Sequence, residues 1–128
     1  MAVIVDASAV AAIAFGEPEG STLTAHLEGE TLLAPALLDF ELANIAVVKA
    51  RRQPDAVAEI VIGLNAALAL PISRIRVPAA DVFILAMQTG LSGYDASYLW
   101  LARSRDAELV TLDRALVRLT NEDTNPET

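Results

Sequence analysis

Four acidic residues stand at positions that suit chemistry better than solubility: Asp6, Glu41, Asp95 and Asp113. Asp6 follows the apolar run Val-Ile-Val and Asp113 follows Glu-Leu-Val-Thr-Leu, so each is expected at the carboxyl end of a strand. Open α/β sheets bind their ligands at that edge. Each aspartate is explained equally well as the N-cap of the following helix, whose free N–H groups it would satisfy.

The other two acids are expected on helices. At 3.6 residues per turn, Glu41 shares its helix face with Leu38 and Ile45. Because buried carboxylates are normally paired or coordinate a metal, a functional role is favoured there over a position at the rim of the apolar stripe. Asp95 starts a helix in the second copy of Asp-Ala-Ser, the first being at Asp6, and capping or function explains it equally well.

Taken together, the four acids could converge at one edge of a parallel sheet, where their mutual repulsion would need cations to offset it. Ligands that are all oxygen suit Mg²⁺ or Mn²⁺ and not zinc. Two such cations can polarise a phosphodiester and lower the pKa of a bound water. A metal-free acid–base site would want paired histidines, and the chain has only His26.

The elements that must position these acids alternate along the chain. Strands are predicted over residues 2–5, 31–34, 72–77 and 108–112. Helices are predicted over residues 8–15, 21–28, 36–52, 57–68, 78–90, from about 95, and 113–119. This alternation predicts a parallel sheet covered by helices on both faces.

Composition limits the possible classes of protein. The 128 residues, 54% of them hydrophobic, predict one globular domain over residues 1–120 and a polar, disordered tail over residues 121–128. The absence of cysteine, of a secretory signal and of a long apolar run leads us to expect a soluble cytoplasmic protein without a membrane span. The net charge of −8 argues against a broad nucleic-acid footprint, unless cations neutralise a concentrated acidic site.

Four blocks in this order resemble the PIN-domain ribonucleases, and within them the VapC toxins of toxin–antitoxin pairs: VIVDASAV, APALLDFELANIAV, LSGYDASYLWLA and ELVTLDRAL. The resemblance spans residues 2–119. It implies a three-layer α/β/α fold with a central parallel sheet of four or five strands. It also implies an Mg²⁺- or Mn²⁺-dependent endoribonuclease whose products carry 5′-phosphate and 3′-hydroxyl ends.

Residue by residue, the resemblance places the catalytic metal site on Asp6, Glu41, Asp95 and Asp113. Ser8 and Thr111 match small hydroxyl residues that flank such a site, although a helix start and a strand residue explain them as well. Asn44 matches a polar residue one turn after the glutamate, where it would orient the carboxylate. The implied partners are the RNA substrate, a cognate VapB-like antitoxin and a second copy in a homodimer.

Seven basic residues are candidates for phosphate contacts, each equally well an ordinary surface charge: Lys49, Arg51, Arg52, Arg103, Arg105, Arg114 and Arg118. The apolar stretches over residues 43–50 and 57–70 could form a groove for an antitoxin helix, or could line the core or the homodimer.

Two other classes of protein remain as alternatives. A phosphoryl-transfer domain would want a second acid beside the first strand or a late lysine, but Asp6-Ala7-Ser8 lacks that acid and Lys49 is the only lysine. A non-catalytic PIN-like binding module is disfavoured by the presence of all four acids. A dinucleotide enzyme is disfavoured because no Gly-x-Gly-x-x-Gly follows a strand.

Overall fold

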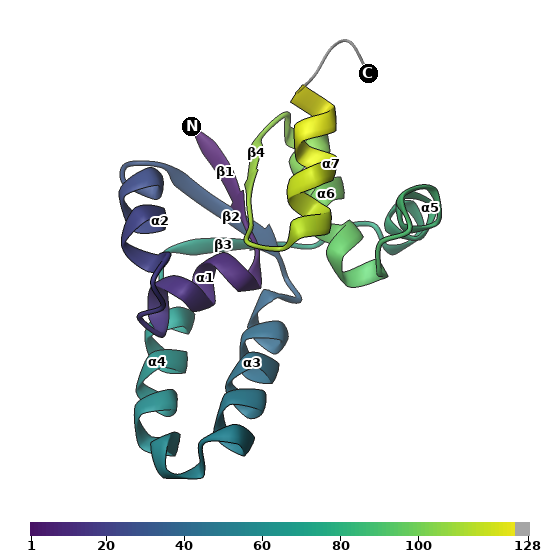
Figure 1. Ribbon diagram of the computed structural model, residues 1–128. Coiled ribbons are helices and arrows are strands. Elements are labelled where there is room, and N and C mark those ends of the chain that lie inside the picture. Colours follow the sequence, from purple (N-terminus) through teal and green to yellow (C-terminus); the bar gives the residue numbers. More distant parts are fainter. Residues whose placement is uncertain (125–128) are drawn as a thin grey trace.

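The computed structural model describes residues 1–124, with side chains to residue 121. Along the chain, strands and helices alternate as shown in Figure 1. The first half contains β1 (Ala2–Val5), α1 (Ala7–Ala14), α2 (Gly20–Leu27), β2 (Thr31–Pro35), α3 (Leu38–Arg52) and the 3₁₀ turn η1 (Pro54–Ala56). The second half contains α4 (Val57–Ala69), β3 (Ile72–Ile75), α5 (Ala79–Thr89), α6 (Gly93–Arg105), β4 (Glu108–Val110) and α7 (Arg114–Thr124).

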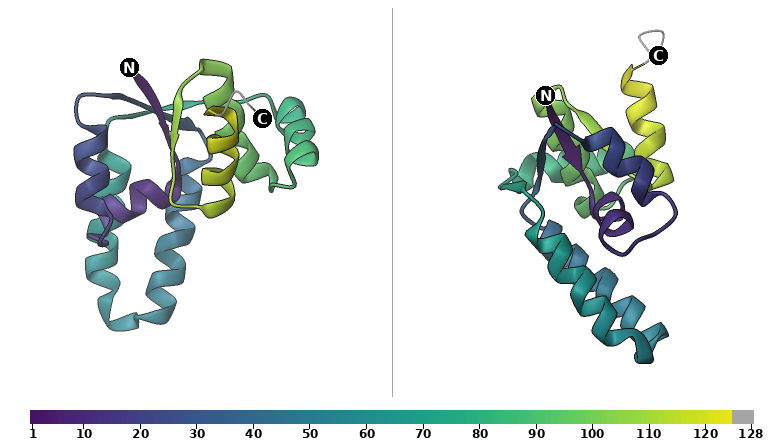
Figure 2. Two further views of the ribbon diagram at one scale, coloured as in Figure 1. Left: turned by 45° about the horizontal axis from the view of Figure 1, so that its top comes forward. Right: turned by 90° about the vertical axis from the view of Figure 1, so that its left-hand side faces the viewer.

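The four strands form one parallel sheet in the order β3-β2-β1-β4, with Ile4 of β1 opposite Leu33 of β2 and Leu109 of β4. Connections from β1 to β2 to β3 step one way along the sheet, and the connection from β3 to β4 steps back. Because such crossovers are right-handed, the helices after β3 cover the opposite face from those before it. Figure 2 shows helices on both sides of the sheet, which confirms the predicted three-layer α/β/α fold.

The core is formed where the sheet meets these helices. Ile4 and Val5 are fully buried, as expected for a parallel strand covered on both faces. From α6, the side chains of Tyr98 and Leu101 are each 1% exposed, and this helix contacts three of the four strands. The centre of the sheet and α6 therefore form a rigid base beneath the strand ends.

Helices α3 and α4 form a hairpin that extends beyond the sheet (Figures 1 and 2). Two polar contacts fix α3 against the rest of the fold: Arg74 of β3 donates to Asp39 at 2.7 Å, and Lys49 donates to Glu17 at 3.1 Å. Lys49 also lies 5.1 Å from the centre of the Phe15 ring. The contact with Arg74 holds the start of α3 next to β3, and the contacts of Lys49 hold its later turns next to Phe15 and Glu17.

The structure corrects three predicted boundaries. Strand β4 ends at Val110 and not at residue 112, because its partner β1 ends at Val5, opposite Val110. Strand β3 ends at Ile75 and not at residue 77, because its partner β2 ends at Pro35, opposite Ile75. Helix α7 continues to Thr124, so the polar residues 121–124 belong to a helix rather than to the predicted tail. The predicted boundary was wrong because a solvent-exposed helical turn and a disordered tail have similar amino-acid compositions. The rest of the predicted tail, residues 125–128, lies outside the described residues, and the part of the chain up to residue 124 contains no fifth strand.

Candidate active site

The four acids singled out by the sequence, here called the acidic cluster (Asp6, Glu41, Asp95 and Asp113), line one open cavity of about 480 Å³. Asp6 directly follows β1, Asp113 lies three residues after the end of β4, and Glu41 and Asp95 lie in the first turns of α3 and α6. Strands β1 and β4 are neighbours whose connections leave in opposite directions, which is where open α/β sheets place their ligand site. A larger cavity of about 660 Å³ lies between α6, β4 and α7 and contains no residue of the acidic cluster.

Asp6 is the most constrained member. Its side chain is 5% exposed, and its Oδ1 accepts hydrogen bonds from the Ser8 hydroxyl at 2.7 Å and from the Ala9 backbone N–H at 3.0 Å. Its Oδ2 accepts a hydrogen bond from the hydroxyl of Thr111. Asp6 is thus the N-cap of α1 and also faces the cavity, so the capping and functional interpretations are compatible.

The same hydroxyl groups join the ends of β1 and β4. Thr111 Oγ1 accepts from the backbone N–H of Asp113 at 2.9 Å, and Ser8 Oγ accepts from the backbone N–H of Leu112 at 2.9 Å. Asp113 Oδ1 in turn accepts from the backbone N–H of Leu116 and caps α7. Ser8 and Thr111 therefore lie beside the acidic cluster and make hydrogen bonds to two of its members, Asp6 and Asp113.

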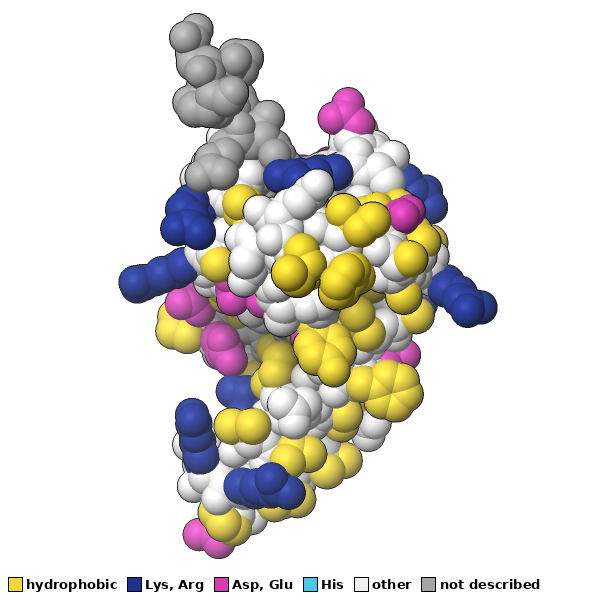
Figure 3. Space-filling view, turned by 90° about the vertical axis from the view of Figure 1, so that its right-hand side faces the viewer, with side chains coloured by type: hydrophobic (Ala, Val, Ile, Leu, Met, Phe, Trp, Pro, Cys, Tyr) yellow, Lys and Arg dark blue, Asp and Glu magenta, His cyan; other side chains and the backbone are white. Residues whose placement is uncertain are grey.

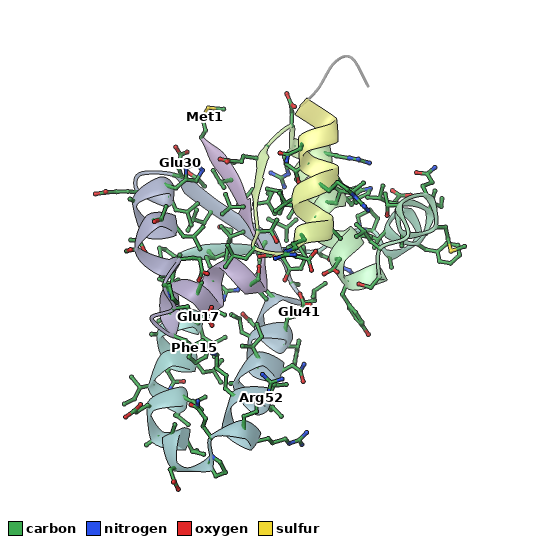
Figure 4. The ribbon with its side chains drawn as sticks, viewed as in Figure 1. Met1, Phe15, Glu17, Glu30, Glu41 and Arg52 are labelled. Atoms are coloured by element: carbon green, nitrogen blue, oxygen red, sulfur yellow. The ribbon has the colours of Figure 1, made fainter. Side chains whose placement is uncertain are left out.

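Glu41 is half-buried at the end of α3 nearest the sheet, whereas Arg52 lies far along the hairpin (Figure 4). Glu41 Oε1 accepts a hydrogen bond of 2.6 Å from the hydroxyl of Tyr98. Asn44 is exposed and lines the same cavity. Among the described residues, the hydrogen bond to Glu41 comes from Tyr98 and not from the predicted Asn44.

Asp95 is the third residue of α6 and not its N-cap, which corrects the sequence interpretation. The cap is Ser92, whose hydroxyl accepts from the backbone N–H of Asp95 at 3.1 Å. Gly93 and Tyr94 belong to the helix, because a serine caps as well as an aspartate does. The Asp95 carboxylate is therefore not used as the cap of its own helix.

Burial raises the pKa values of three members of the acidic cluster. Desolvation is the main cause for Asp6, Glu41 and Asp95, and neighbouring carboxylates of the cluster raise each of them further. Hydrogen bonds act in the opposite direction: Thr111 and Ser8 lower the pKa of Asp6, and Tyr98 lowers that of Glu41. Burial and the nearby carboxylates also raise the pKa of the Tyr98 hydroxyl far above its ordinary value, so this group remains a donor.

The chemistry of the acidic cluster fits a hard divalent cation, since the donors are oxygen atoms whose repulsion a cation would relieve. Within residues 1–121, no group of three or more acidic or histidine side chains is arranged as a ready-formed metal site. Mg²⁺ keeps several water ligands and is commonly held through only one or two carboxylates. Four carboxylates that line one open cavity are compatible with that mode of binding.

Three aromatic residues that the sequence did not single out line the cavity: Phe40, Tyr94 and Tyr98. Phe40 and Tyr94 are 80% and 68% exposed, whereas Tyr98 is buried. One signal could have identified Tyr98, because it lies three residues after Asp95 and so on the same face of α6. The seven basic residues proposed for phosphate contacts all lie in the described part of the chain, and none of them lines this cavity.

The PIN domain profile matches residues 3–122, so the chain belongs to the PIN domain family. Members of this family are in general nucleases and typically use divalent metals. The predicted family is thereby confirmed at the level of the PIN domain.

The chain is also similar to a solved protein, described as the crystal structure of PAE2754 from Pyrobaculum aerophilum. The two share 32% sequence identity with a TM-score of 0.73, over 92% of this chain and 86% of the other. No curated protein matches the chain. In the described part of the chain, no helix is both long enough and apolar enough to cross a bilayer.

Proposed function

We propose that this chain is a metal-dependent endoribonuclease and the toxin of a type II toxin–antitoxin pair of VapC type. It would hydrolyse RNA phosphodiester bonds with an activated water and leave 5′-phosphate and 3′-hydroxyl ends. One observation carries the proposal: four carboxylates from four separate elements line a single cavity at the carboxyl edge of the sheet. Because charge repulsion opposes that arrangement, a functional reason for it is needed.

The acidic cluster provides the residues that would hold Mg²⁺ or Mn²⁺. When bound, such a cation polarises a phosphodiester and lowers the pKa of a water molecule. The chain itself supplies the placement. Ser8 and Thr111 fix the direction of the Asp6 carboxylate, and partial desolvation of the cavity strengthens each electrostatic contact made there.

Two exposed aromatic side chains support RNA as the substrate. Phe40 and Tyr94 line the cavity and are mostly exposed to solvent. Unpaired bases stack on such side chains, a contact available only where the strand is not in a duplex. A local site of this kind is compatible with the net charge of −8, which disfavours broad coating of nucleic acid.

Partner binding is supported by exposed apolar side chains. Figure 3 shows hydrophobic side chains gathered over α5 and over the α3–α4 hairpin below it. On α5, Phe83 and Met87 are 64% and 72% exposed, and on the hairpin Ile62 is 70% exposed. Such patches mark interaction surfaces, and we assign them to the homodimer and to a VapB-like antitoxin. A toxin that acts on cellular RNA would work in the cytoplasm.

The direct test is cleavage of a total-RNA sample by the purified protein, free of antitoxin, with Mg²⁺ or Mn²⁺ and with EDTA. We expect discrete fragments that appear only when metal is present. The Asp6→Asn change should lower the rate of cleavage about 10³-fold, because several kcal/mol of transition-state stabilisation would be lost. Asp95→Asn should abolish cleavage as well. Asp81→Asn is the matched control, since Asp81 is also a first-turn acid, on α5, but is exposed.

The toxin assignment has its own readout. Induced expression of the wild-type chain should arrest growth, whereas the Asp6→Asn variant should not, and co-expression of the adjacent gene should restore growth. Metal-independent fragments, or fragments that persist in the Asp6→Asn variant, would contradict the nuclease. Cleavage without growth arrest would contradict the toxin role alone.

A further inference from the structure

The acidic cluster receives one hydrogen bond that links two helices from different parts of the chain. The Tyr98 hydroxyl, on α6, donates to Glu41 Oε1, on α3, at 2.6 Å. Along the chain, helix α3 comes between β2 and β3, and helix α6 comes between β3 and β4. The contact therefore joins residues 57 positions apart in the sequence, and both of them line the cavity.

The two ends of this contact differ in mobility. The side chain of Tyr98 is 1% exposed and packed in the hydrophobic core, so its ring has little freedom. Glu41 is half-buried at the surface of the cavity, on a helix face that it shares with partly buried Leu37 and Ile45. A flexible carboxylate is thus tied to a fixed hydroxyl.

The chemistry of the contact leaves the carboxylate usable. A neutral phenol supplies one proton and occupies one acceptor site on Oε1, while a carboxylate offers about four such sites on two oxygens. Glu41 can therefore be held by Tyr98 and still present oxygen to the cavity. Asp95 lies three residues before Tyr98 and so on the same side of α6, which relates the position of Glu41 to that of Asp95.

We propose that Tyr98 is a positioning residue of the acidic site: its hydroxyl holds Glu41 toward Asp95 so that the two carboxylates are prearranged to bind a divalent cation. This inference rests on the proposed function, because the cation site is part of it. Tyr98 itself is not assigned any contact with the cation or with RNA.

The test is Tyr98→Phe, which removes one hydroxyl and keeps the buried ring, compared with Tyr94→Phe on the same helix and the same cavity. Mn²⁺ binding to the metal-free protein is titrated by calorimetry. We expect Tyr98→Phe to weaken Mn²⁺ binding about 10-fold or more, the usual consequence of removing a group that orients a metal ligand. Tyr94→Phe should change the affinity less than twofold, since Tyr94 is 68% exposed.

A double-variant comparison separates positioning from general loosening of the fold. If Tyr98 acts through Glu41, then adding Tyr98→Phe to Glu41→Gln should produce no further loss of Mn²⁺ affinity, because coupled sites are not additive. A full additional loss would show that Tyr98 acts elsewhere. An Mn²⁺ affinity of Tyr98→Phe equal to or higher than that of the wild type would overturn the inference.

A crystal structure of metal-free Tyr98→Phe gives a readout that does not depend on the proposed function. We expect the Glu41 carboxylate to leave its present position, and a carboxylate that stays in place would overturn the inference. If the wild type bound no Mn²⁺ at all, the metal site in the proposed function would be wrong. The position of Glu41 in this crystal structure would still decide whether Tyr98 holds it.

Discussion

The two sides of the acidic cavity are built differently. On the strand side, the Asp6 carboxylate accepts from the hydroxyls of Ser8 and Thr111, and the bond from Thr111 joins the ends of β1 and β4. Asp113 donates its backbone N–H to Thr111 and accepts from the backbone N–H of Leu116. On the helix side, Glu41 is held by a single contact between side chains, and Asp95 lies on a helix capped by another residue. The hydrogen bonds on the strand side therefore also stabilise the fold, whereas the single contact on the helix side involves only side chains of the site.

This difference separates stability from function. Changes on the strand side should affect both the fold and the site, because the hydrogen bonds there serve both. Changes on the helix side should affect the site while leaving the fold intact or making it more stable, because they remove charge repulsion. Three experiments test this comparison, in order of decreasing expected effect.

The largest effect on folding is expected for Thr111→Val. The Thr111 hydroxyl donates to the buried Asp6 carboxylate and accepts from the Asp113 backbone. Loss of a hydrogen bond to a charged group costs about 2 kcal/mol, so the free energy of unfolding in urea should fall by about that amount. Thr24→Val is the control: the Thr24 hydroxyl only returns a bond to the carbonyl of Gly20, and its loss should cost less than about 0.5 kcal/mol. Equal effects of the two changes would contradict a structural role for the strand side.

A smaller effect of opposite sign is expected for Glu41→Gln. The amide can still accept from Tyr98, and the change removes one charge from a cavity where desolvation and neighbouring carboxylates disfavour it. The melting temperature of the metal-free protein should therefore rise, and the further increase on adding Mn²⁺ should disappear. Glu59→Gln is the matched control, because Glu59 lies in the first turn of α4 and is exposed. A lower melting temperature for Glu41→Gln would place Glu41 with the structural half of the site.

The smallest effect is a pH dependence of the increase in melting temperature expected for Glu41→Gln. A carboxyl group whose pKa is raised by folding destabilises the folded state at pH values above the raised pKa. The penalty is lost as the pH falls through the raised value and is absent below the ordinary value, which is 4.5 for Glu41. The difference in melting temperature between Glu41→Gln and the wild type should therefore shrink from about pH 8 to about pH 4. A difference that is constant over this range would mean that charge is not its cause.

The sequence predicted the strand side of the site better than the helix side. Asp6 comes directly after the buried strand β1, so its place at the edge of the sheet could be predicted from local pattern. Asp113 lies three residues after the end of β4, where its backbone N–H bonds Thr111. The contact of Tyr98 with Glu41 depends on how α3 and α6 are brought together, which no local pattern determines. The cap of α6 was missed for another reason, since both Ser92 and Asp95 are residue types that cap helices.

The fold was predictable for a similar reason. Alternating strands and helices determine a parallel sheet almost by themselves, and the right-handed connections determine which face of the sheet each helix covers. The end of β3 depends instead on where its neighbour β2 stops. The extent of α7 depends on which polar residues continue a helix into solvent, and composition does not distinguish such a turn from a tail.

Anomalous diffraction from crystals of the wild-type protein soaked in Mn²⁺ would show directly whether the acidic cluster forms one cation site. We expect an anomalous peak inside the cavity, in contact with Asp6 and at least one other member of the cluster, and its loss in Asp6→Asn crystals. A peak only at other surface carboxylates, or none at an Mn²⁺ concentration that supports RNA cleavage, would mean that the acidic cluster is not a cation site.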